Sequence, residues 1–379
     1  MSKSSIEWTD ETWNPVSGCT RVSAGCDNCY AVKMTKRLDA MGQEKYSGLV
    51  NLGKGHFNGI VKCHEDTLTI PLKAKKPRRY FVNSMSDLFH KEVPLEFIDT
   101  VFAVMALCPQ HTFQILTKRP ERMAEYLSFV DPGGFREVVW ANALRHLRDP
   151  EPFRSTTSAV PWPLPNVWLG TSVEDQATAD ERIPHLLRCP AAVRFLSCEP
   201  LLGPVDLSRW LCGANPEGRP LGYCVLCGSP KGFPESHESH DNAWPSCLNP
   251  ECIAAHEAKA SVSFKRSLHW VIVGGESGPG ARPMHPNWAR SLRDQCVAAQ
   301  VPFFFKQWGE WAPDDALSGE SLTVAQKVCG PNREYVAPNG EFDGMGLLPG
   351  IVTMNRVGKH RAGRLLDGRT WDEFPQVPG

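Results

Sequence analysis

Short apolar runs rich in aromatic and β-branched residues recur along the chain, and each one stops at a group of polar residues. Six of these runs are Arg79–Asn83, Thr112–Leu116, Val167–Leu169, Val193–Leu196, Trp270–Val273 and Pro302–Phe305. Nearly continuous apolar runs of this length are typical of strands that are covered on both faces, as in a parallel sheet. A further strand is predicted near Trp13–Ser17, which brings the expected number to about seven.

Helical spacing of apolar residues occupies several of the stretches between these runs. Helices are predicted at Ala31–Ala40, Leu95–Cys108, Gln176–Cys189 and Asn287–Gln300. Repeated alternation of strand and helix indicates an α/β protein with a parallel sheet. We expect a complete or partial (β/α) barrel of the TIM type, and a doubly wound open sheet is the alternative.

Three stretches interrupt this alternation and suggest the domain organisation. The barrel is expected to comprise residues 1–206 and 269–311, with 129–166 as an insertion rich in Pro, Gly and Arg. Residues 207–268 hold five cysteines among many Gly and Pro residues, and we expect a separate small insertion there. Residues 312–379 show little apolar periodicity and are expected to wrap the barrel as irregular structure.

The composition limits the classes of function. The 379 residues include 41 Lys and Arg and 42 Asp and Glu, a net charge of −1, which argues against a general polyanion binder. The N-terminus has no apolar signal region, and no apolar run approaches the roughly 18 residues that span a bilayer. We therefore expect a cytoplasmic protein without a membrane partner. In that compartment clustered cysteines, among the 14 present, indicate metal ligands rather than disulfides.

The first cysteine cluster consists of three thiols in one loop: Cys19, Cys26 and Cys29. Its C-x6-C-x2-C spacing follows the predicted first strand and precedes a predicted helix. Three thiolates from one loop can hold a [4Fe–4S] cluster and leave its fourth iron open, which is what S-adenosylmethionine (SAM) chemistry requires. The alternatives are a zinc site completed by His56, Cys63 or His64, and small buried hydrophobic residues without a ligand role.

The second cluster is a CxxC…Cx4C pattern in the 207–268 insertion: Cys224, Cys227, Cys247 and Cys252. This spacing is close to that of a four-cysteine zinc ribbon, and a segment without its own apolar periodicity needs a metal to fold. We expect structural Zn²⁺, and a second iron–sulfur cluster is the alternative. His237, His240 and His256 are other potential ligands, although solvated loop histidines are the simpler interpretation.

Polar residues at the ends of the predicted strands form the rest of the candidate site, because the carboxyl ends of parallel strands meet at one end of a barrel. The candidates for cofactor binding are Asn83, Ser84, Asp87, Thr171, Ser172, Glu174, Gly274, Gly275, Glu276 and Ser277. The candidates for a catalytic role are Lys118, Glu199 and Lys306. A lysine can hold a carboxylate or phosphate, and paired glycines let backbone approach a ligand.

Simpler roles compete with these interpretations. Each polar residue is also compatible with an ordinary cap or turn, and Ser84 with Asp87 matches a capping box. Trp308 and Trp311 are candidates for stacking on a base, or for core packing. Cys198 is a further candidate for a role in the site, because it lies at the end of a predicted strand, directly before Glu199.

The chain resembles a phage- and prophage-borne family of radical-SAM-like three-cysteine proteins over nearly its whole length. The motifs are Ile6–Asp10, Trp13–Pro15, Gly18–Tyr30, Ser84–Phe89, Leu116–Pro120, Leu169–Glu174, Ser197–Pro200, Gly274–Gly278, Phe305–Gly309 and Gly363–Pro375. The common radical SAM pattern is C-x3-C-x2-C, with a Gly-Gly-Glu after the second strand. Here the first gap is six residues, and Gly-Gly-Glu lies far downstream.

The resemblance implies a radical SAM enzyme that uses a [4Fe–4S] cluster and SAM to generate a 5′-deoxyadenosyl radical. Some members resemble enzymes of thymidine hypermodification, which implies a nucleobase in phage DNA as substrate. One such step isomerises N-linked glycinyl-thymine to the C-linked form. Nucleic acid or a nucleotide and an electron donor such as flavodoxin or ferredoxin are the implied partners. The alternatives are a DNA repair enzyme similar to photoproduct lyase, and a non-enzymatic zinc-dependent nucleic-acid-binding or adaptor protein.

Overall fold

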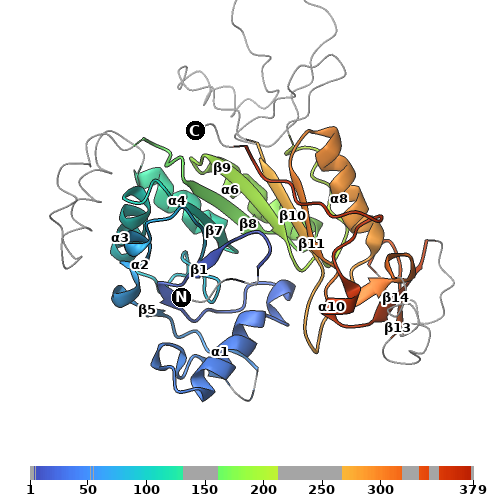
Figure 1. Ribbon diagram of the computed structural model, residues 1–379, viewed down its shortest axis with the longest axis horizontal. Coiled ribbons are helices and arrows are strands. Elements are labelled where there is room, and N and C mark those ends of the chain that lie inside the picture. The colour runs from blue at the N-terminus through green and yellow to red at the C-terminus, as the bar shows by residue number, and fades with distance from the viewer. Residues whose placement is uncertain are drawn as a thin grey trace, which may run out of the picture.

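A seven-stranded parallel sheet forms the centre of the protein and curls into a half-barrel (Figure 1). The computed structural model describes residues 4, 6–51, 53, 55–130, 161–211, 267–317, 333–340 and 350–376. The strands are β1 (Glu11–Trp13), β6 (Arg79–Val82), β7 (Thr112–Thr117), β8 (Val167–Ser172), β9 (Val193–Cys198), β10 (Trp270–Gly274) and β11 (Phe303–Gln307). Their order in the sheet is their order in the chain, so the expected partial barrel is confirmed and the doubly wound alternative is wrong.

Within the described residues, four helices cover the outer face of the sheet (Figure 1). They are α3 (Leu95–Ala106), α4 (Pro120–Val130), α6 (Gln176–Arg188) and α8 (Pro286–Ala298). The start of α6 is fixed by a capping box, in which the Asp175 carboxylate accepts a hydrogen bond of 2.8 Å from the Thr178 backbone N–H. The helices predicted from apolar spacing are confirmed, with ends that differ by one or two residues.

Alternate residues of the strands build two apolar layers, one against the helices and one on the concave face. The concave layer contains Trp8, Phe81, Trp168, Val193, Phe195, Trp270, Ile272 and Phe304. Gly170 is required within it, because a Cβ there would lie 2.5 Å from the Phe195 ring. The segment before β1 contributes Trp8, which packs against Phe81. The interior of the half-barrel is therefore filled with aromatic side chains below the polar ends of the strands.

The first part of the chain differs from its prediction. β1 ends at Trp13, and residues Val16–Ser17 form β2, which pairs antiparallel with β5 (Lys62–Cys63). Pro15 separates the two strands and has no N–H to donate to a sheet ladder. Two further short strands, β3 (Val50–Asn51) and β4 (His56–Phe57), form a hairpin after α1 (Tyr30–Ala40). The short helix α2 (Ile70–Lys73) precedes β6.

The C-terminal part is more regular than expected. β12 (Trp311–Pro313), β13 (Arg333–Val336) and β14 (Val352–Arg356) form a three-stranded antiparallel sheet in the order β12-β14-β13, followed by α10 (Lys359–Ala362). The expectation of irregular structure throughout is therefore wrong. The last described residues cover the edge of β11, where the Phe305 N–H donates to the Trp371 carbonyl at 2.9 Å.

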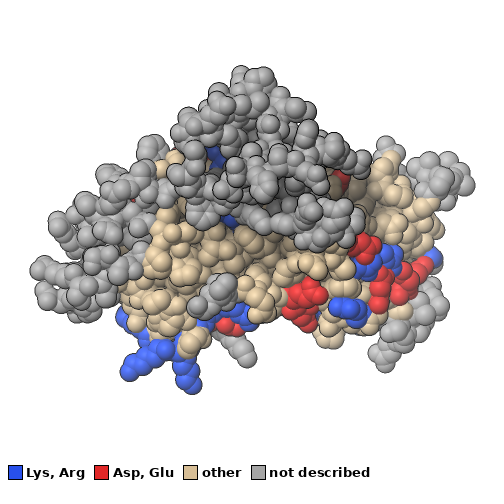
Figure 2. Space-filling model, turned by 90° about the horizontal axis from the view of Figure 1, so that it is seen from above, with Lys and Arg blue, Asp and Glu red and all other residues tan. Residues whose placement is uncertain are grey.

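The second cysteine cluster lies outside the described residues, together with most of both predicted insertions. Within the ranges that the structure describes, no helix is both long and apolar enough to cross a membrane. On the face shown in Figure 2, basic side chains gather at one end, and acidic and basic side chains are interspersed at the other. The described part of that face has no continuous basic stripe.

Candidate functional site

The loop that carries the three cysteines lies at the carboxyl end of the first two strands of the sheet. Gly18 opens it with a φ of +87°, forms a bridge with Ser86 beyond β6, and has the Ile60 carbonyl too close for any side chain. Cys26 ends a short 3-10 turn, and α1 begins at Tyr30, directly after Cys29. Cys19, Cys26 and Cys29 are all half-buried free thiols. The loop therefore presents three sulfurs at the open end of the half-barrel.

The loop's environment keeps two of these thiols protonated. Burial raises the pKa of Cys19 to about 12, assisted by Asp87 and opposed by Arg119. Burial likewise raises the pKa of Cys29. A bound metal would displace these protons. Within the described ranges, no three His, Cys, Asp or Glu side chains converge on a common metal position. Of the other predicted zinc ligands, His64 is engaged, with Nε2 2.8 Å from Ser17 Oγ.

Asp87 fixes the start of the loop, at Cys19 and Thr20, through Arg119. Arg119 Nη1 lies 2.8 Å from Asp87 Oδ2 and 3.7 Å from Cys19 Sγ, and Nη2 donates to the Thr20 carbonyl at 3.2 Å. The other Asp87 oxygen accepts a hydrogen bond of 2.7 Å from Thr117 Oγ1 at the end of β7. Asp87 therefore links the end of a strand to the cysteine loop.

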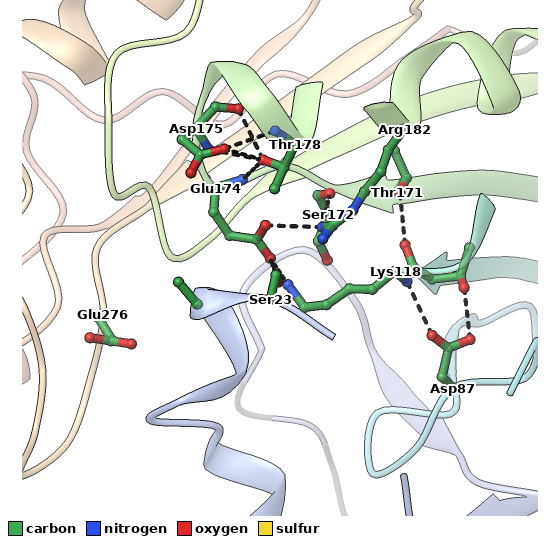
Figure 3. A network of polar contacts seen from close by, with 12 residues as sticks. Ser23, Asp87, Lys118, Thr171, Ser172, Glu174, Asp175, Thr178, Arg182 and Glu276 are labelled. Atoms are coloured by element: carbon green, nitrogen blue, oxygen red, sulfur yellow. Dashed lines mark hydrogen bonds and ion pairs between the residues drawn. The ribbon is translucent and has the colours of Figure 1, made fainter. Parts of the chain in front are cut away.

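Glu174 holds the middle of the loop and is the centre of a buried network (Figure 3). Only 1% of its side chain is exposed, and it accepts hydrogen bonds from Ser23 Oγ at 2.9 Å and Arg182 Nη1 at 3.0 Å, and a further one from Lys118. Burial acts to raise the pKa of Glu174, but Lys118 and Arg182 outweigh it and the pKa is lowered. The loop passes so near that a Cβ on Gly25 would lie 2.5 Å from Glu174 Oε1.

Glu276 fixes the part of the loop around Asn28. Its Oε2 accepts hydrogen bonds from Asn28 Nδ2 at 3.0 Å and from Arg282 Nε at 3.0 Å. Arg282 Nη2 also donates to the Ala24 carbonyl at 2.9 Å. Carboxylates that follow β6, β8 and β10 are thus directed at one loop, so Asp87, Glu174 and Glu276 are positioning residues for the cysteines.

Lys306 and Glu199 form an ion pair that belongs to a different part of the site. Lys306 Nζ lies 2.8 Å from each Glu199 carboxylate oxygen, and Gln307 Nε2 donates to Glu199 Oε1 at 3.0 Å. Gln307 also donates to Ser277 Oγ at 3.1 Å. Gly274 leaves room beside the pair, since a Cβ there would lie 3.3 Å from Glu199. The side chains of Lys306 and Glu199 are 12% and 19% exposed, and no described hydrogen bond joins them to the loop.

Several predicted ligand-binding residues serve the fold instead. Thr171 is fully buried and donates to the Thr117 carbonyl at 2.8 Å, so its hydroxyl is used within the sheet. Ser172 is buried on the concave face, and its carbonyl accepts from Arg182 at 2.9 Å. Gly275 makes room for the Trp308 carbonyl rather than for a ligand.

The residues after β6 position the first loop. Asn83, at a φ of +60°, accepts a hydrogen bond of 3.2 Å from the Val16 N–H through its side chain. Ser84 donates to Asn14 Oδ1 at 3.1 Å, and its carbonyl accepts from the Tyr30 hydroxyl at 2.5 Å. No described helix begins between Ser84 and Asp87, so the capping-box interpretation is wrong there.

Buried residues account for other candidates. Trp308 and Trp311 are 1% and 2% exposed and donate to backbone carbonyls, so the stacking interpretation is wrong and they are packing residues. Cys198 is fully buried in the helix-side core, and burial raises the pKa of its thiol.

Sequence reasoning missed Ser23, Asn28, Arg182 and Arg282, which fix the loop. For Ser23 and Asn28 the contacts cross 151 and 248 residues, so no local pattern marks them. Arg182 carried a weak signal, because it lies eight residues after Glu174 on an otherwise amphipathic helix.

Comparison with known proteins identifies a family. The model of a protein family described as "Protein of unknown function (DUF5131)" matches residues 3–375. No curated protein and no solved structure matches the chain.

Proposed function

We propose that this chain, which belongs to the DUF5131 family, is a radical SAM enzyme whose cluster is held by Cys19, Cys26 and Cys29. The observation that carries the proposal is the loop of three thiols at the open end of a parallel half-barrel, clamped from the ends of three strands. Preorganisation of this kind is expected where a reactive group must be positioned accurately.

The residues fit a [4Fe–4S] cluster by their chemistry. All three are thiols, none is in a disulfide, and they come from one loop. A cluster binds its three thiolates through three different irons, so the sulfurs need not converge on one point. With SAM, such a cluster supplies a 5′-deoxyadenosyl radical that removes hydrogen from unactivated carbon. The guanidinium of Arg119, 3.7 Å from Cys19 Sγ, is placed to offset thiolate charge.

The Lys306–Glu199 pair supports a substrate that carries both an amine and a carboxylate. A glycinyl group on a thymine has both, and the two side chains offer a cation and an anion side by side. In this assignment Lys306 binds the carboxylate and Glu199 the amine, which orients the glycine α-carbon. The aromatic layer below, which includes Phe304 and Phe195, excludes water from that end of the site. The proposed reaction is the isomerisation of N-linked to C-linked glycinyl-thymine in DNA.

Product analysis tests this assignment. The reconstituted protein is incubated without oxygen with SAM, dithionite and one of three substrates: DNA containing N-glycinyl-thymine, the corresponding free nucleotide, or ultraviolet-damaged DNA. We expect a product of unchanged mass and altered linkage from the modified DNA, and its loss in Lys306→Met. Repair of the damaged DNA instead would assign a lyase of the photoproduct type. A protein that holds only zinc and converts none of the substrates would be an adaptor.

The zinc ribbon at Cys224, Cys227, Cys247 and Cys252 stays a prediction. Metal analysis of a Cys224→Ser variant checks it.

A further inference from the structure

The outer surface of the cysteine-bearing segment is unusually apolar for an exposed surface. Five of the eight exposed large hydrophobic side chains of the described residues lie there: Val22, Tyr30, Met34, Met41 and Ile60. Three of them follow helical spacing along α1 and its end, so they share one face, and Met41 is 63% exposed. The opposite face of α1 is buried through Ala31, Val32 and Thr35. Tyr30, Met34 and Met41 therefore form one exposed apolar face of α1, and exposed apolar faces commonly mark an interaction site.

The segment that carries this surface has a basic composition, although the whole chain does not. Residues 19–63 contain seven Lys or Arg and three Asp or Glu, a net charge of +4 in a chain whose total is −1. Lys33 and Arg37 lie on the exposed face of α1 beside Met34. Neither forms an ion pair within the residues that the structure describes. In Figure 1, α1 lies below the sheet, apart from the outer helices.

We infer that this face of α1 docks an acidic one-electron carrier protein. The inference rests on the proposed function, because it gives the cluster its reductant. α1 begins one residue after Cys29, so a carrier seated on it lies next to the cysteine loop, and electron transfer slows steeply with distance. Complexes of this kind have small interfaces, and charge complementarity steers their encounter. Exposed methionines adapt to different partner surfaces.

The electron balance is simple. The flavin hydroquinone anion of the carrier loses one electron and becomes the neutral semiquinone. The oxidised cluster gains that electron, and no proton or group is transferred. Nucleic acid is the alternative partner for a basic surface. Its affinity would fall steeply as the salt concentration rises, by an amount set by the number of phosphates that the protein contacts.

A binding titration with a bacterial flavodoxin tests the inference without any turnover. The whole protein is compared with Lys33→Glu/Arg37→Glu, with Met34→Gln/Met41→Gln and with the control Lys75→Glu/Lys76→Glu, whose lysines are exposed before β6. Unfolding temperature is measured for each variant. We expect Kd for flavodoxin to rise at least about tenfold in both α1 variants and to change less than about twofold in the control.

Cluster reduction is followed in the same proteins with reduced flavodoxin and with dithionite. The α1 variants should be slow with flavodoxin and normal with dithionite. Equal flavodoxin affinity in all variants would overturn the inference. So would loss of affinity for a DNA oligonucleotide without loss for flavodoxin, which would assign the face to nucleic acid. A protein that binds flavodoxin through α1 but forms no cluster would instead count against the proposed function.

Discussion

Lys306 Nζ lies 2.8 Å from both carboxylate oxygens of Glu199, at the open end of the half-barrel. Lys306 comes from the last strand of the sheet, and Glu199 follows the strand two places away. The carboxylates after β6, β8 and β10 all turn to the cysteine loop, whereas this pair does not. The site therefore has two parts, one that positions the cysteines and one that faces the interior.

The first prediction concerns that pair. Lys306→Met or Glu199→Gln leaves one charge without its partner and removes one of the two contacts proposed for the substrate. We expect kcat/KM to fall about 10²-fold, because misplacement of a bound substrate has effects of this size. Iron content should stay at the wild-type value, since no described hydrogen bond joins either residue to the loop. The control is Lys359→Met, an exposed lysine 3.7 Å from Glu7, which should leave activity unchanged. Loss of iron in Lys306→Met would show that the pair supports the cluster rather than the substrate.

The second prediction concerns the buried network around Glu174. Arg182→Met removes one of two cations from a carboxylate that is 1% exposed. Breaking a buried pair from one side costs about 3–5 kcal/mol. Urea unfolding should show a loss of that order in the free energy of unfolding. The matched control is Arg209→Met, which breaks an exposed pair with Asp180 and should cost no more than about 1 kcal/mol. Equal losses in the two variants would contradict this account of Glu174.

The strands, the helices and the open end of the sheet follow from the sequence because they depend on local periodicity. α6 and α3 begin at the residues that their apolar spacing predicts. Glu199 after β9 and Lys306 near the end of β11 are both among the residues predicted for a catalytic role. The predicted first strand, Trp13–Ser17, spans the end of β1 and the whole of β2, because Pro15 between them has no N–H to continue a ladder.

The roles of the polar residues could not be predicted, because they depend on contacts between distant segments. Glu276 binds Asn28 across 248 residues, and Glu174 binds Ser23 across 151. From sequence, these glutamates are indistinguishable from Glu199, which faces the interior. The predicted strand ends at Leu169, whereas β8 continues three residues further to Ser172, which places the Thr171 side chain among the sheet's own hydrogen bonds.

The third prediction concerns the approach of the loop to Glu174. Gly25→Ala places a methyl group 2.5 Å from Glu174 Oε1, so the loop must move away. We expect the variant to lose most of the iron that the wild type retains after gel filtration, because the cysteines leave their positions. Gly53→Ala is the matched control, since its nearest neighbour would be 3.5 Å away. Wild-type iron content in Gly25→Ala would mean that the loop tolerates this displacement.

The fourth prediction concerns stability in acid. Burial lowers the pKa of His269 from 6.5 to about 4, and its Nδ1 accepts a hydrogen bond of 2.9 Å from the Arg194 N–H. The unfolded chain binds a proton below pH 6.5 and the folded protein does not, so stability falls as pH drops from 6.5 to about 4. The full contribution is at most about 3 kcal/mol. Burial also lowers the pKa of His64 and His90 to about 4, and both contribute to the same fall in stability. His269→Gln should therefore make this part of the profile shallower, and exposed His360→Gln should leave it intact. Identical profiles for the wild type and His269→Gln would contradict the prediction.

The most direct test of the central claim is anaerobic reconstitution with iron and sulfide, followed by incubation with SAM and dithionite. The wild type and the control Cys63→Ser, which alters a half-buried thiol outside the loop, should hold four irons per chain. Both should show broad visible absorbance and release 5′-deoxyadenosine. Cys26→Ala should lose the absorbance and the product together. A wild-type protein that binds only zinc and releases no 5′-deoxyadenosine would contradict the account.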